Sequence, residues 1–291
     1  MSQIGKSRSV VIFAHNEANN IEACLESVLE DHVGGELLVS VLANGCTDTT
    51  ELKVRAQQRY YHNLRLISLP FADKANAWNH YVHELAPENA THFFVDGDIV
   101  VAKDALMHLT EALQTHPEAN SVGAVPGNGK DRIAWTERML KYGRLSGGLY
   151  ALRSDFVSEI RAHRLRMPIG FIGDDFLIST ISKRMPYPSG VYNPSKHLLI
   201  VPTACFILQS LSPFHPANLV LYVRRLIRDR IRSYQLAMLM NLTAEHGFSA
   251  MPQSVEQMYR VSSLLPRYQW RGLLTPLDIL AVRMIRRSLE Q

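Results

Sequence analysis

The stretch Phe93-Phe94-Val95-Asp96-Gly97-Asp98 ends a short apolar strand with two carboxylates that flank one glycine. Glycine lets the backbone turn tightly, so both aspartates can face the same pocket. Two close carboxylates repel each other unless a cation lies between them, and their hard oxygen atoms suit Mg²⁺ or Mn²⁺. Because Asp-Gly-Asp is also common in solvated turns, this stretch alone leaves both interpretations open.

Three other apolar runs in the first half of the chain also end in polar residues. The runs are Ser9–Ala14, Leu37–Leu42 and Leu64–Leu69, and the polar clusters after them are His15-Asn16-Glu17, Asn44–Asp48 and Asp73-Lys74. Helical spacing between the runs predicts an α/β fold with a mostly parallel sheet and helices on both faces. Ligands bind beyond the carboxyl ends of such strands. We therefore expect these clusters and Asp96-Gly97-Asp98 to meet at one edge of the sheet.

The second half of the chain is less regular. Gly143–Leu152 is glycine-rich and then alternates into a strand, and the adjacent carboxylates Asp174-Asp175 follow an apolar lead-in. Leu198–Leu208 is an apolar strand. We predict a long helix over residues 218–242 that carries five arginines, and a final helix over Pro276–Leu289.

The net charge of the chain is an average over two unlike parts. The 291 residues are 46% hydrophobic and 20% charged, which argues against disorder and against a disulfide-rich scaffold. Residues 1–131 carry 9 Lys and Arg against 17 Asp and Glu, a net charge of −8. Residues 132–291 carry 22 against 10, a net charge of +12, so the overall charge of +4 joins an acidic half to a basic half.

Cysteine usage and hydropathy bear on the compartment. The three cysteines form no C-x-x-C pair, which suits a reducing compartment and argues against a structural zinc site. The longest apolar stretch, Leu198–Leu208, contains Pro202 and is far shorter than the ~20 residues of a spanning helix. We expect a soluble, cytoplasmic protein, and peripheral contact with the inner face of the membrane stays open.

Six motifs, in this order, resemble the inverting family 2 glycosyltransferases of the GT-A fold. They are Val10–Ala18 (VVIFAHNEA), Ala43–Thr50 (ANGCTDTT), Asp73–Asn79 (DKANAWN), Phe94–Asp98 (FVDGD, a DxD motif), Gly147–Arg153 (GGLYALR) and Gly173-Asp174-Asp175. The resemblance implies a GT-A domain over residues 8–215, with a Rossmann-like donor half at about 8–126 and an acceptor half at about 127–215. Residues 216–291 would form a C-terminal helical extension.

The resemblance also assigns residues to a nucleotide-sugar donor, a UDP-sugar by expectation, and to a metal ion. Glu17 and Asn44 would contact the base or the ribose, and Lys74 would lie near the nucleotide, although an ordinary surface lysine at a helix start is equally compatible with its position. Asp98, with Asp96 close by, would hold Mg²⁺ or Mn²⁺ against the diphosphate. His215 is a candidate third metal ligand, because a histidine serves this purpose in some GT-A enzymes.

Inversion at the sugar also requires a base that takes the proton of the acceptor hydroxyl. Asp175 aligns with the aspartate of the family's Glu-Asp pair and is the candidate base, with Asp174 in support. The same two acids could instead favour the N-terminus of a helix, and both roles are compatible.

Three departures from the family pattern refine this prediction. Asn44 stands where many members carry Asp, and Asp73 replaces the glycine before Lys74. The Gln-x-x-Arg-Trp sequence of processive polysaccharide synthases is absent, which favours an enzyme that adds a single sugar. The acceptor could be a glycan, a lipid-linked molecule or a small molecule.

The arginines at 224, 225, 228, 230 and 232 leave three interpretations open. They could bind the diphosphate, rest on anionic lipid, or form a solvated helix face. Two other functions are alternatives to the transferase. A nucleotidyltransferase is disfavoured because its glycine-rich, arginine-containing loop is absent after the first strand. A non-catalytic membrane- or nucleic-acid-binding protein is disfavoured because clustered acids repel phosphate backbones, and we expect no nucleic-acid partner.

Overall fold

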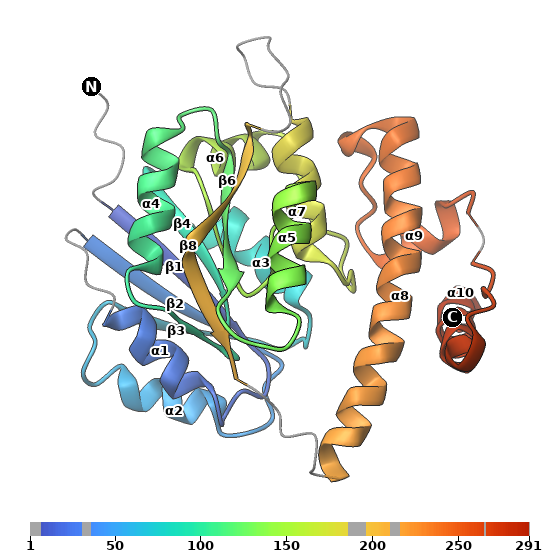
Figure 1. Cartoon of the computed structure of the whole chain (residues 1–291), viewed down its shortest axis with the longest axis horizontal. Coiled ribbons are helices and arrows are strands. Elements are labelled where there is room, and N and C mark those ends of the chain that lie inside the picture. Colours follow the sequence, from blue (N-terminus) through green and yellow to red (C-terminus); the bar gives the residue numbers. More distant parts are fainter. Residues whose placement is uncertain (1–6, 31–35, 186–195, 210–215, 265, 291) are drawn as a thin grey trace. The chain divides into compact units, whose positions relative to one another are not determined.

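A computed structural model of the chain describes residues 7–30, 36–185, 196–209, 216–264 and 266–290 (Figure 1). The chain divides into two compact units. Unit 1 comprises Met1–Ala162 and Asp175–Gln209, and unit 2 comprises His163–Asp174 and Ser210–Gln291. Unit 2 thus takes in a short segment from inside the predicted acceptor half.

Unit 1 is built on one mixed sheet, whose strand order among the described residues is β3-β2-β1-β4-β7-β6-β8-β5. The strands are β1 (Ser7–Ala14), β2 (Glu36–Asn44), β3 (Leu64–Leu69), β4 (Ala90–Asp96), β5 (Ile99–Val101), β6 (Ser121–Pro126), β7 (Leu149–Leu152) and β8 (Leu198–Leu208). Strands β3, β2, β1 and β4 are mutually parallel. Beyond them β7 pairs antiparallel with both β4 and β6, so the direction changes next to β4.

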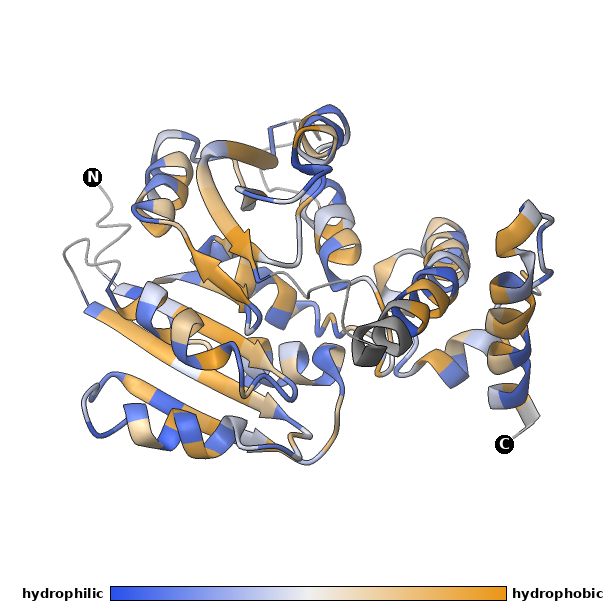
Figure 2. Cartoon of the chain, turned by 60° about the horizontal axis from the view of Figure 1, so that its bottom comes forward, coloured by the Kyte–Doolittle hydropathy of each residue, from blue (hydrophilic) through white to orange (hydrophobic). Residues whose placement is uncertain are grey.

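Helices cover both faces of this sheet (Figures 1 and 2). They are α1 (Ile21–Leu29), α2 (Thr50–Gln57), α3 (Lys74–His80), the π-helical turn η1 (Tyr81–Leu85), α4 (Ala105–Thr115), α5 (Arg132–Tyr142), α6 (Ser154–Ala162) and α7 (Asp174–Arg184). Side chains of β4 show how the faces divide. Phe93 and Val95 join the core under α1 and α4. Phe94 points to the opposite face, where its ring stacks on Tyr150 with centroids 4.8 Å apart.

Unit 2 is helical. It contains α8 (Pro216–His246), the 3₁₀ turns η2 (Phe248–Ala250) and η3 (Gly272–Leu274), α9 (Val255–Val261) and α10 (Thr275–Glu290). Apolar side chains of three helices are buried in it: Met238, Leu239 and Leu242 of α8, Met258 of α9, and Ala281, Val282 and Ile285 of α10. The segment 163–174 joins this unit through a bridge between Ile169 and Ser254 and a hydrogen bond from the Ile172 N–H to Gln235 Oε1 (2.7 Å).

The structure confirms the predicted α/β sheet with helices on both faces, and a helical C-terminal region is present. The apolar run Leu198–Leu208 is a strand over the predicted residues. Helices α5, α6 and α9 were not predicted. Of the helices that the described residues form, none is long and apolar enough to span a membrane.

Candidate active site

The polar clusters after β1, β2 and β4 meet at one edge of the sheet because these strands pair in register. Ala14 pairs with Ala43, and Phe13 pairs with Asp96. The three strands therefore end at the same level. The Gly97 N–H donates to the Phe13 carbonyl (2.9 Å), which holds the turn after β4 against the end of β1.

Hydrogen bonds tie the loop after β1 to the loop after β2. The Asn16 side-chain oxygen accepts from the backbone N–H groups of Thr47 (2.8 Å) and Asp48 (3.3 Å). Asp48 returns the contact by accepting from the Ala18 N–H (3.0 Å), and His15 Nδ1 donates to the Asn44 carbonyl (2.7 Å). These bonds join the two loops into one wall of the edge.

Two residues have the left-handed backbone that this wall requires. Asn16 has φ +56°, a conformation that asparagine tolerates better than most residues. Gly45 has φ +61°, and a Cβ atom there would lie 2.5 Å from the Ala72 backbone nitrogen. The roles of Asn16 and Asp48 were not predicted. The sequence shows only that short polar residues follow a strand, and this does not predict the hydrogen bonds that each of them forms.

The two predicted base or ribose contacts lie at this wall. Asn44 is the last residue of β2 and is almost fully buried. Glu17 is partly buried and accepts a hydrogen bond from Asn20 Nδ2 (2.7 Å). Burial raises the pKa of Glu17, and the nearby charges of Asp98 and Asp48 raise it further, against the opposing effect of Asn20. The edge therefore gathers negative charge.

Lys74 points to this edge instead of to solvent. Its Nζ lies 2.5 Å from Asp96 Oδ1, and it also lies over the ring of Phe13. Asp73 orients the start of α3, because its side chain accepts from the Asn76 N–H (2.7 Å). On the other side of the pair, a Cβ atom at Gly147 would lie 3.3 Å from Asp96 Oδ2 and 3.4 Å from Lys74 Nζ. This ion pair with Asp96 favours a lysine of the candidate site over an ordinary surface lysine.

Asp98 lies in the turn between β4 and β5, and Cys24 of α1 lies beneath this turn. The Cys24 thiol is fully buried and donates to the Asp96 carbonyl (3.7 Å). Burial raises the pKa of Cys24 far above its ordinary value, and the charges of Asp98, Asp96 and Glu17 add to the rise. The thiol consequently stays protonated and carries no charge below the carboxylates.

The donor set at this edge fits a hard divalent cation. Asp98 and Asp96 supply carboxylate oxygens, the ligand type that Mg²⁺ prefers, and Mg²⁺ commonly uses one or two protein carboxylates together with substrate phosphates. Within the described residues, no group of three or more His, Cys, Asp or Glu side chains could hold a metal ion. Water and substrate oxygens commonly complete the coordination of Mg²⁺ at sites with one or two protein carboxylates. His215, the predicted third ligand, lies outside the described residues.

The predicted catalytic pair lies at the start of α7. The first segment of unit 2 ends there at Asp174, and the second segment of unit 1 begins at Asp175. Within unit 1, Ser179 Oγ donates to the Asp175 carbonyl (2.6 Å) and accepts from the Leu145 N–H (2.9 Å). Three residues further on, the Gly148 carbonyl accepts from the Asp96 N–H (3.1 Å). The first turn of α7 is thus linked through residues 145–148 to the end of β4.

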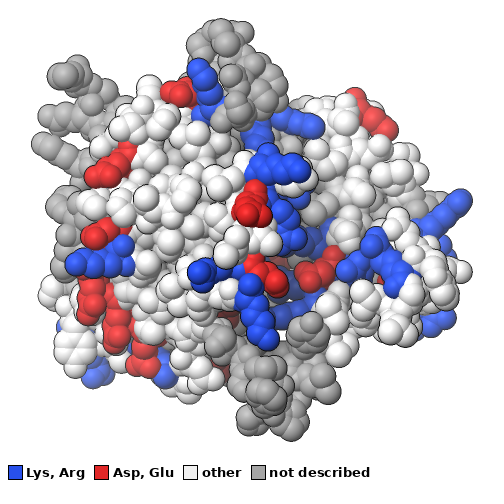
Figure 3. Space-filling model, in the orientation of Figure 1, with Lys and Arg blue, Asp and Glu red and all other residues white. Residues whose placement is uncertain are grey.

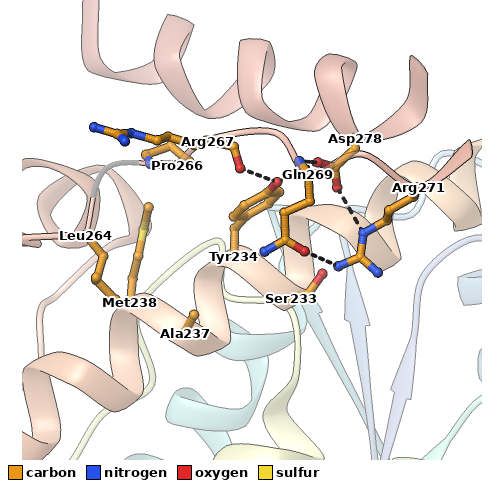
Figure 4. Close-up of a pocket in the computed structure, with 10 residues that line it drawn as sticks. All are labelled: Ser233, Tyr234, Ala237, Met238, Leu264, Pro266, Arg267, Gln269, Arg271 and Asp278. Atoms are coloured by element: carbon orange, nitrogen blue, oxygen red, sulfur yellow. Dashed lines mark hydrogen bonds and ion pairs between the residues drawn. The ribbon is translucent and has the colours of Figure 1, made fainter. Parts of the chain in front are cut away.

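A cavity of about 300 Å³ lies elsewhere, within unit 2 (Figure 4). Its lining includes no residue of the predicted site; it consists of Ser233, Tyr234, Ala237, Met238, Leu264, Pro266, Arg267, Gln269, Arg271 and Asp278. Asp278 is almost fully buried and accepts from the Tyr234 hydroxyl (2.7 Å) and from the Gln269 N–H (2.5 Å). The polar groups of this cavity therefore bind one another and hold the segment after residue 266 against α8.

Comparison with known proteins gives a family and a fold. Residues 9–176 match the model of glycosyl transferase family 2, and this range contains Glu17, Asn44, Lys74, Asp96, Asp98, Asp174 and Asp175. A comparison with curated proteins found no match.

Three solved structures of 16–19% sequence identity share the GT-A fold. A mannosyltransferase from Pyrobaculum calidifontis, in complex with GDP-Man and Mn²⁺, has a TM-score of 0.57 at 16% identity over 98% of this chain and 74% of that one. TarS 1–349 of S. aureus, in complex with UDP-GlcNAc, has a TM-score of 0.56 at 16% identity over 98% and 81%. Glucosyl-3-phosphoglycerate synthase from Mycobacterium tuberculosis, in complex with Mn²⁺, UDP and phosphoglyceric acid, has a TM-score of 0.54 at 19% identity over 85% and 80%.

Proposed function

The chain belongs to glycosyl transferase family 2, and from this premise we propose that it transfers one sugar from a UDP-sugar to an acceptor hydroxyl with inversion. The observation that carries the proposal is the strand-end edge of unit 1, where Glu17, Asn44, Asp96 and Asp98 gather around loops that are already locked. A rigid site of this kind favours binding and orientation of a small ligand without a further ordering cost.

Glu17 and Asn44 contact the base or ribose of the donor in this proposal. Both lie beside the hydrogen-bonded wall formed by Asn16 and Asp48, so their side chains need little reorganisation. A UDP-sugar is the preferred donor because a uracil edge offers both hydrogen-bond donors and acceptors to a carboxylate and an amide. TarS and the phosphoglycerate synthase bind UDP compounds, whereas the mannosyltransferase binds GDP-Man.

Asp98 and Asp96 are proposed to hold Mg²⁺ or Mn²⁺ together with the diphosphate. A divalent ion, when bound, offsets the negative charge that develops on the departing nucleoside diphosphate. Lys74 holds Asp96 in place through its ion pair and supplies one positive charge at the same edge. Two of the similar solved structures contain Mn²⁺, which agrees with a metal at this fold.

Asp175 is the proposed base and Asp174 the residue that supports it. Asp175 takes the proton from the acceptor hydroxyl while that oxygen forms a bond to the anomeric carbon of the sugar. The bond from this carbon to the diphosphate breaks, and the nucleoside diphosphate leaves with the electron pair. The hydrogen bonds that link α7 to residues 145–148 and β4 support this arrangement, because they tie the helix start to the donor edge.

The acceptor is proposed to be a glycan, a lipid-linked molecule or a small molecule that carries a free hydroxyl. The reaction is proposed to occur in the cytoplasm, the reducing compartment that suits the three free cysteines, with peripheral contact to the membrane. His215 is retained as a candidate metal ligand on the sequence alone.

The test is to incubate the protein with a panel of UDP-sugars and GDP-mannose, with Mn²⁺ or with EDTA, and to measure release of the nucleoside diphosphate. We expect Mn²⁺-dependent release of UDP from one UDP-sugar, and ¹H NMR of the product should show an anomeric configuration opposite to that of the donor. No release from any donor would contradict the proposal. Formation of a nucleotide-sugar from a nucleoside triphosphate and a sugar phosphate would favour a nucleotidyltransferase instead.

A further inference from the structure

Large apolar side chains lie exposed near the end of unit 2. Leu273 is 98% exposed, Trp270 83%, Tyr268 60%, Met284 50% and Leu280 44%. Single exposed apolar residues are common, but five within 17 residues of sequence form a group that water solvates poorly. We call these five residues, together with Arg267, Arg271, Arg283 and Arg287, the C-terminal face.

Helix α10 carries a second set of exposed residues. Its exposed residues Pro276, Leu280, Met284 and Arg287 recur every three or four positions and so share one stripe of the helix. Ala281, Val282 and Ile285 lie on the opposite stripe and are buried in unit 2. Figure 2 shows hydrophobic and hydrophilic residues side by side along this helix, which ends at the label C. One stripe of the helix is therefore packed inside unit 2, and the other exposes apolar side chains to solvent.

The segment before α10 is anchored, so the exposure of its aromatic residues is built into the fold. Asp278 accepts from the Gln269 N–H and from the Tyr234 hydroxyl, and Arg271 Nη2 donates to Gln269 Oε1 (2.7 Å; Figure 4). Tyr268 and Trp270 flank the residue that Asp278 holds. Both rings are consequently presented outward from a fixed backbone, which lowers the entropy lost when they contact a partner.

Charge identifies the kind of partner. Residues 267–290 contain five arginines and two acids, Glu290 and the buried Asp278. Unit 2 as a whole contains 13 arginines, no lysine and six acids, a net charge of +7. Figure 3 shows basic side chains on the visible surface of this region. An anionic surface complements this face, and arginine binds phosphate groups with its planar fork.

We propose that the C-terminal face is a docking surface for the headgroup region of an anionic phospholipid bilayer. Tryptophan and tyrosine favour the boundary between headgroups and acyl chains, while arginine reaches the lipid phosphates. A second copy of the chain fits this face less well. Symmetric packing would bring arginines against arginines, because residues 267–290 carry five arginines and, besides the buried Asp278, one acid. The proposal does not depend on the chemistry of unit 1.

The test is flotation of the full chain with vesicles of phosphatidylglycerol and phosphatidylcholine, and with vesicles of phosphatidylcholine alone. We expect binding to the anionic vesicles only. The double variant Trp270→Ser/Leu273→Ser and the double variant Arg283→Gln/Arg287→Gln should each reduce the partition coefficient at least about tenfold. Increased salt should weaken binding by the wild-type protein.

A matched control removes exposed apolar groups from unit 1. Leu52→Ser/Tyr60→Ser changes side chains that are 66% and 77% exposed, and it should leave vesicle binding unchanged. Circular dichroism checks that every variant is folded. Equal loss in this control, or no binding of the wild-type protein to anionic vesicles, overturns the proposal. A wild-type dimer that Trp270→Ser/Leu273→Ser converts to monomer, without any vesicle binding, would instead assign the face to a second copy.

Discussion

The strand-end edge of unit 1 and the C-terminal face of unit 2 present their polar groups in opposite ways. At the edge, Asn16, Asp48 and the Lys74–Asp96 pair bind across loops and leave little side-chain freedom. At the face, aromatic and arginine side chains stand out from an anchored backbone into solvent. A set of side chains that bind one another suits one small ligand and chemistry upon it, whereas an exposed mixed set suits a broad surface.

The net charges separate in the same way. Unit 1 has a net charge of −3 and unit 2 a net charge of +7, although the whole chain has +4. In Figure 3, acidic side chains gather at the lower left, where Figure 1 draws α1 and α2. A basic isoelectric point near 9.0 therefore does not describe unit 1, which contains the carboxylates of the strand-end edge. The following predictions test whether chemistry belongs to the edge alone.

The largest effect is expected from Asp175→Asn, which removes the proposed base but preserves side-chain shape. Loss of a general base typically lowers turnover by about 10²–10⁴-fold, so transfer should fall by this order. Steady-state release of the nucleoside diphosphate in the presence of acceptor measures it. Donor affinity should change little, and full activity of the variant would remove Asp175 from the mechanism.

Asp98→Ala should follow, with a loss of about 10²–10³-fold in turnover, the scale seen when one transition-state charge partner is removed. The metal concentration needed for half-maximal activity should also rise. Asp131→Ala is the matched control, because Asp131 is an exposed acid of unit 1 that makes no side-chain cap bond. Equal losses of turnover in both variants would show that Asp98 has no specific role at a metal site.

Lys74→Met is expected to cost about 10–100-fold in kcat/KM, because hydrogen bonds to charged groups contribute about 1.5–3 kcal/mol. The variant leaves Asp96 without its ion-pair partner. Measurement of kcat/KM at several Mn²⁺ concentrations distinguishes two outcomes. A lysine that only covers the surface would give wild-type values at every metal concentration.

The last prediction concerns stability instead of activity, namely how the stability of unit 1 depends on pH. Burial, with a smaller effect from the charge of Arg161, lowers the pKa of His92 to about 4 from its ordinary value of 6.5. The unfolded chain binds the proton first, so the free energy of unfolding should fall as the pH drops from about 6.5 towards 4, by at most about 3 kcal/mol. Above pH 6.5 this contribution is constant.

His92→Gln removes the titration and keeps a polar partner for the Tyr81 hydroxyl, which lies 3.0 Å from His92 Nδ1. Urea unfolding at pH 4.5 and pH 7 should show a smaller difference in the variant than in the wild-type protein. The exposed His163 of unit 2 provides the control, since His163→Gln should leave the slope unchanged. Identical slopes for the wild-type protein and His92→Gln would show that this histidine does not couple to folding.

Local sequence patterns predicted much of the fold of unit 1. Apolar runs such as Leu198–Leu208 fix their own strand, and turn residues such as Gly97 mark where a strand ends. The order of β7, β6, β8 and β5 was not predicted, because pairing between distant strands leaves no local pattern. Helix α5 was missed for a related reason: Ile133 and Leu140 are exposed, so its apolar spacing does not mark a buried face.

For the site, the sequence indicated residue types but not their partners. Strand ends placed Glu17, Asn44, Asp96 and Asp98 at one edge, and register in the sheet accounts for this. The ion pair between Lys74 and Asp96 and the hydrogen bond between Thr47 and Asn16 depend on loop conformations. The spacing of residues in the sequence does not encode these conformations. The C-terminal face was not predicted either, since the exposure of Trp270 and Leu273 depends on tertiary packing that no local spacing encodes.

Thermal unfolding with a panel of nucleotide-sugars, with and without Mn²⁺, tests the central claim most directly, because binding at the strand-end edge precedes any transfer. The account predicts a Mn²⁺-dependent rise in the melting temperature of the wild-type protein for one UDP-sugar. This rise should disappear in Asp98→Ala and persist in Trp270→Ser/Leu273→Ser. An equal, metal-independent rise in the wild-type protein and Asp98→Ala, or no rise with any donor, would contradict it.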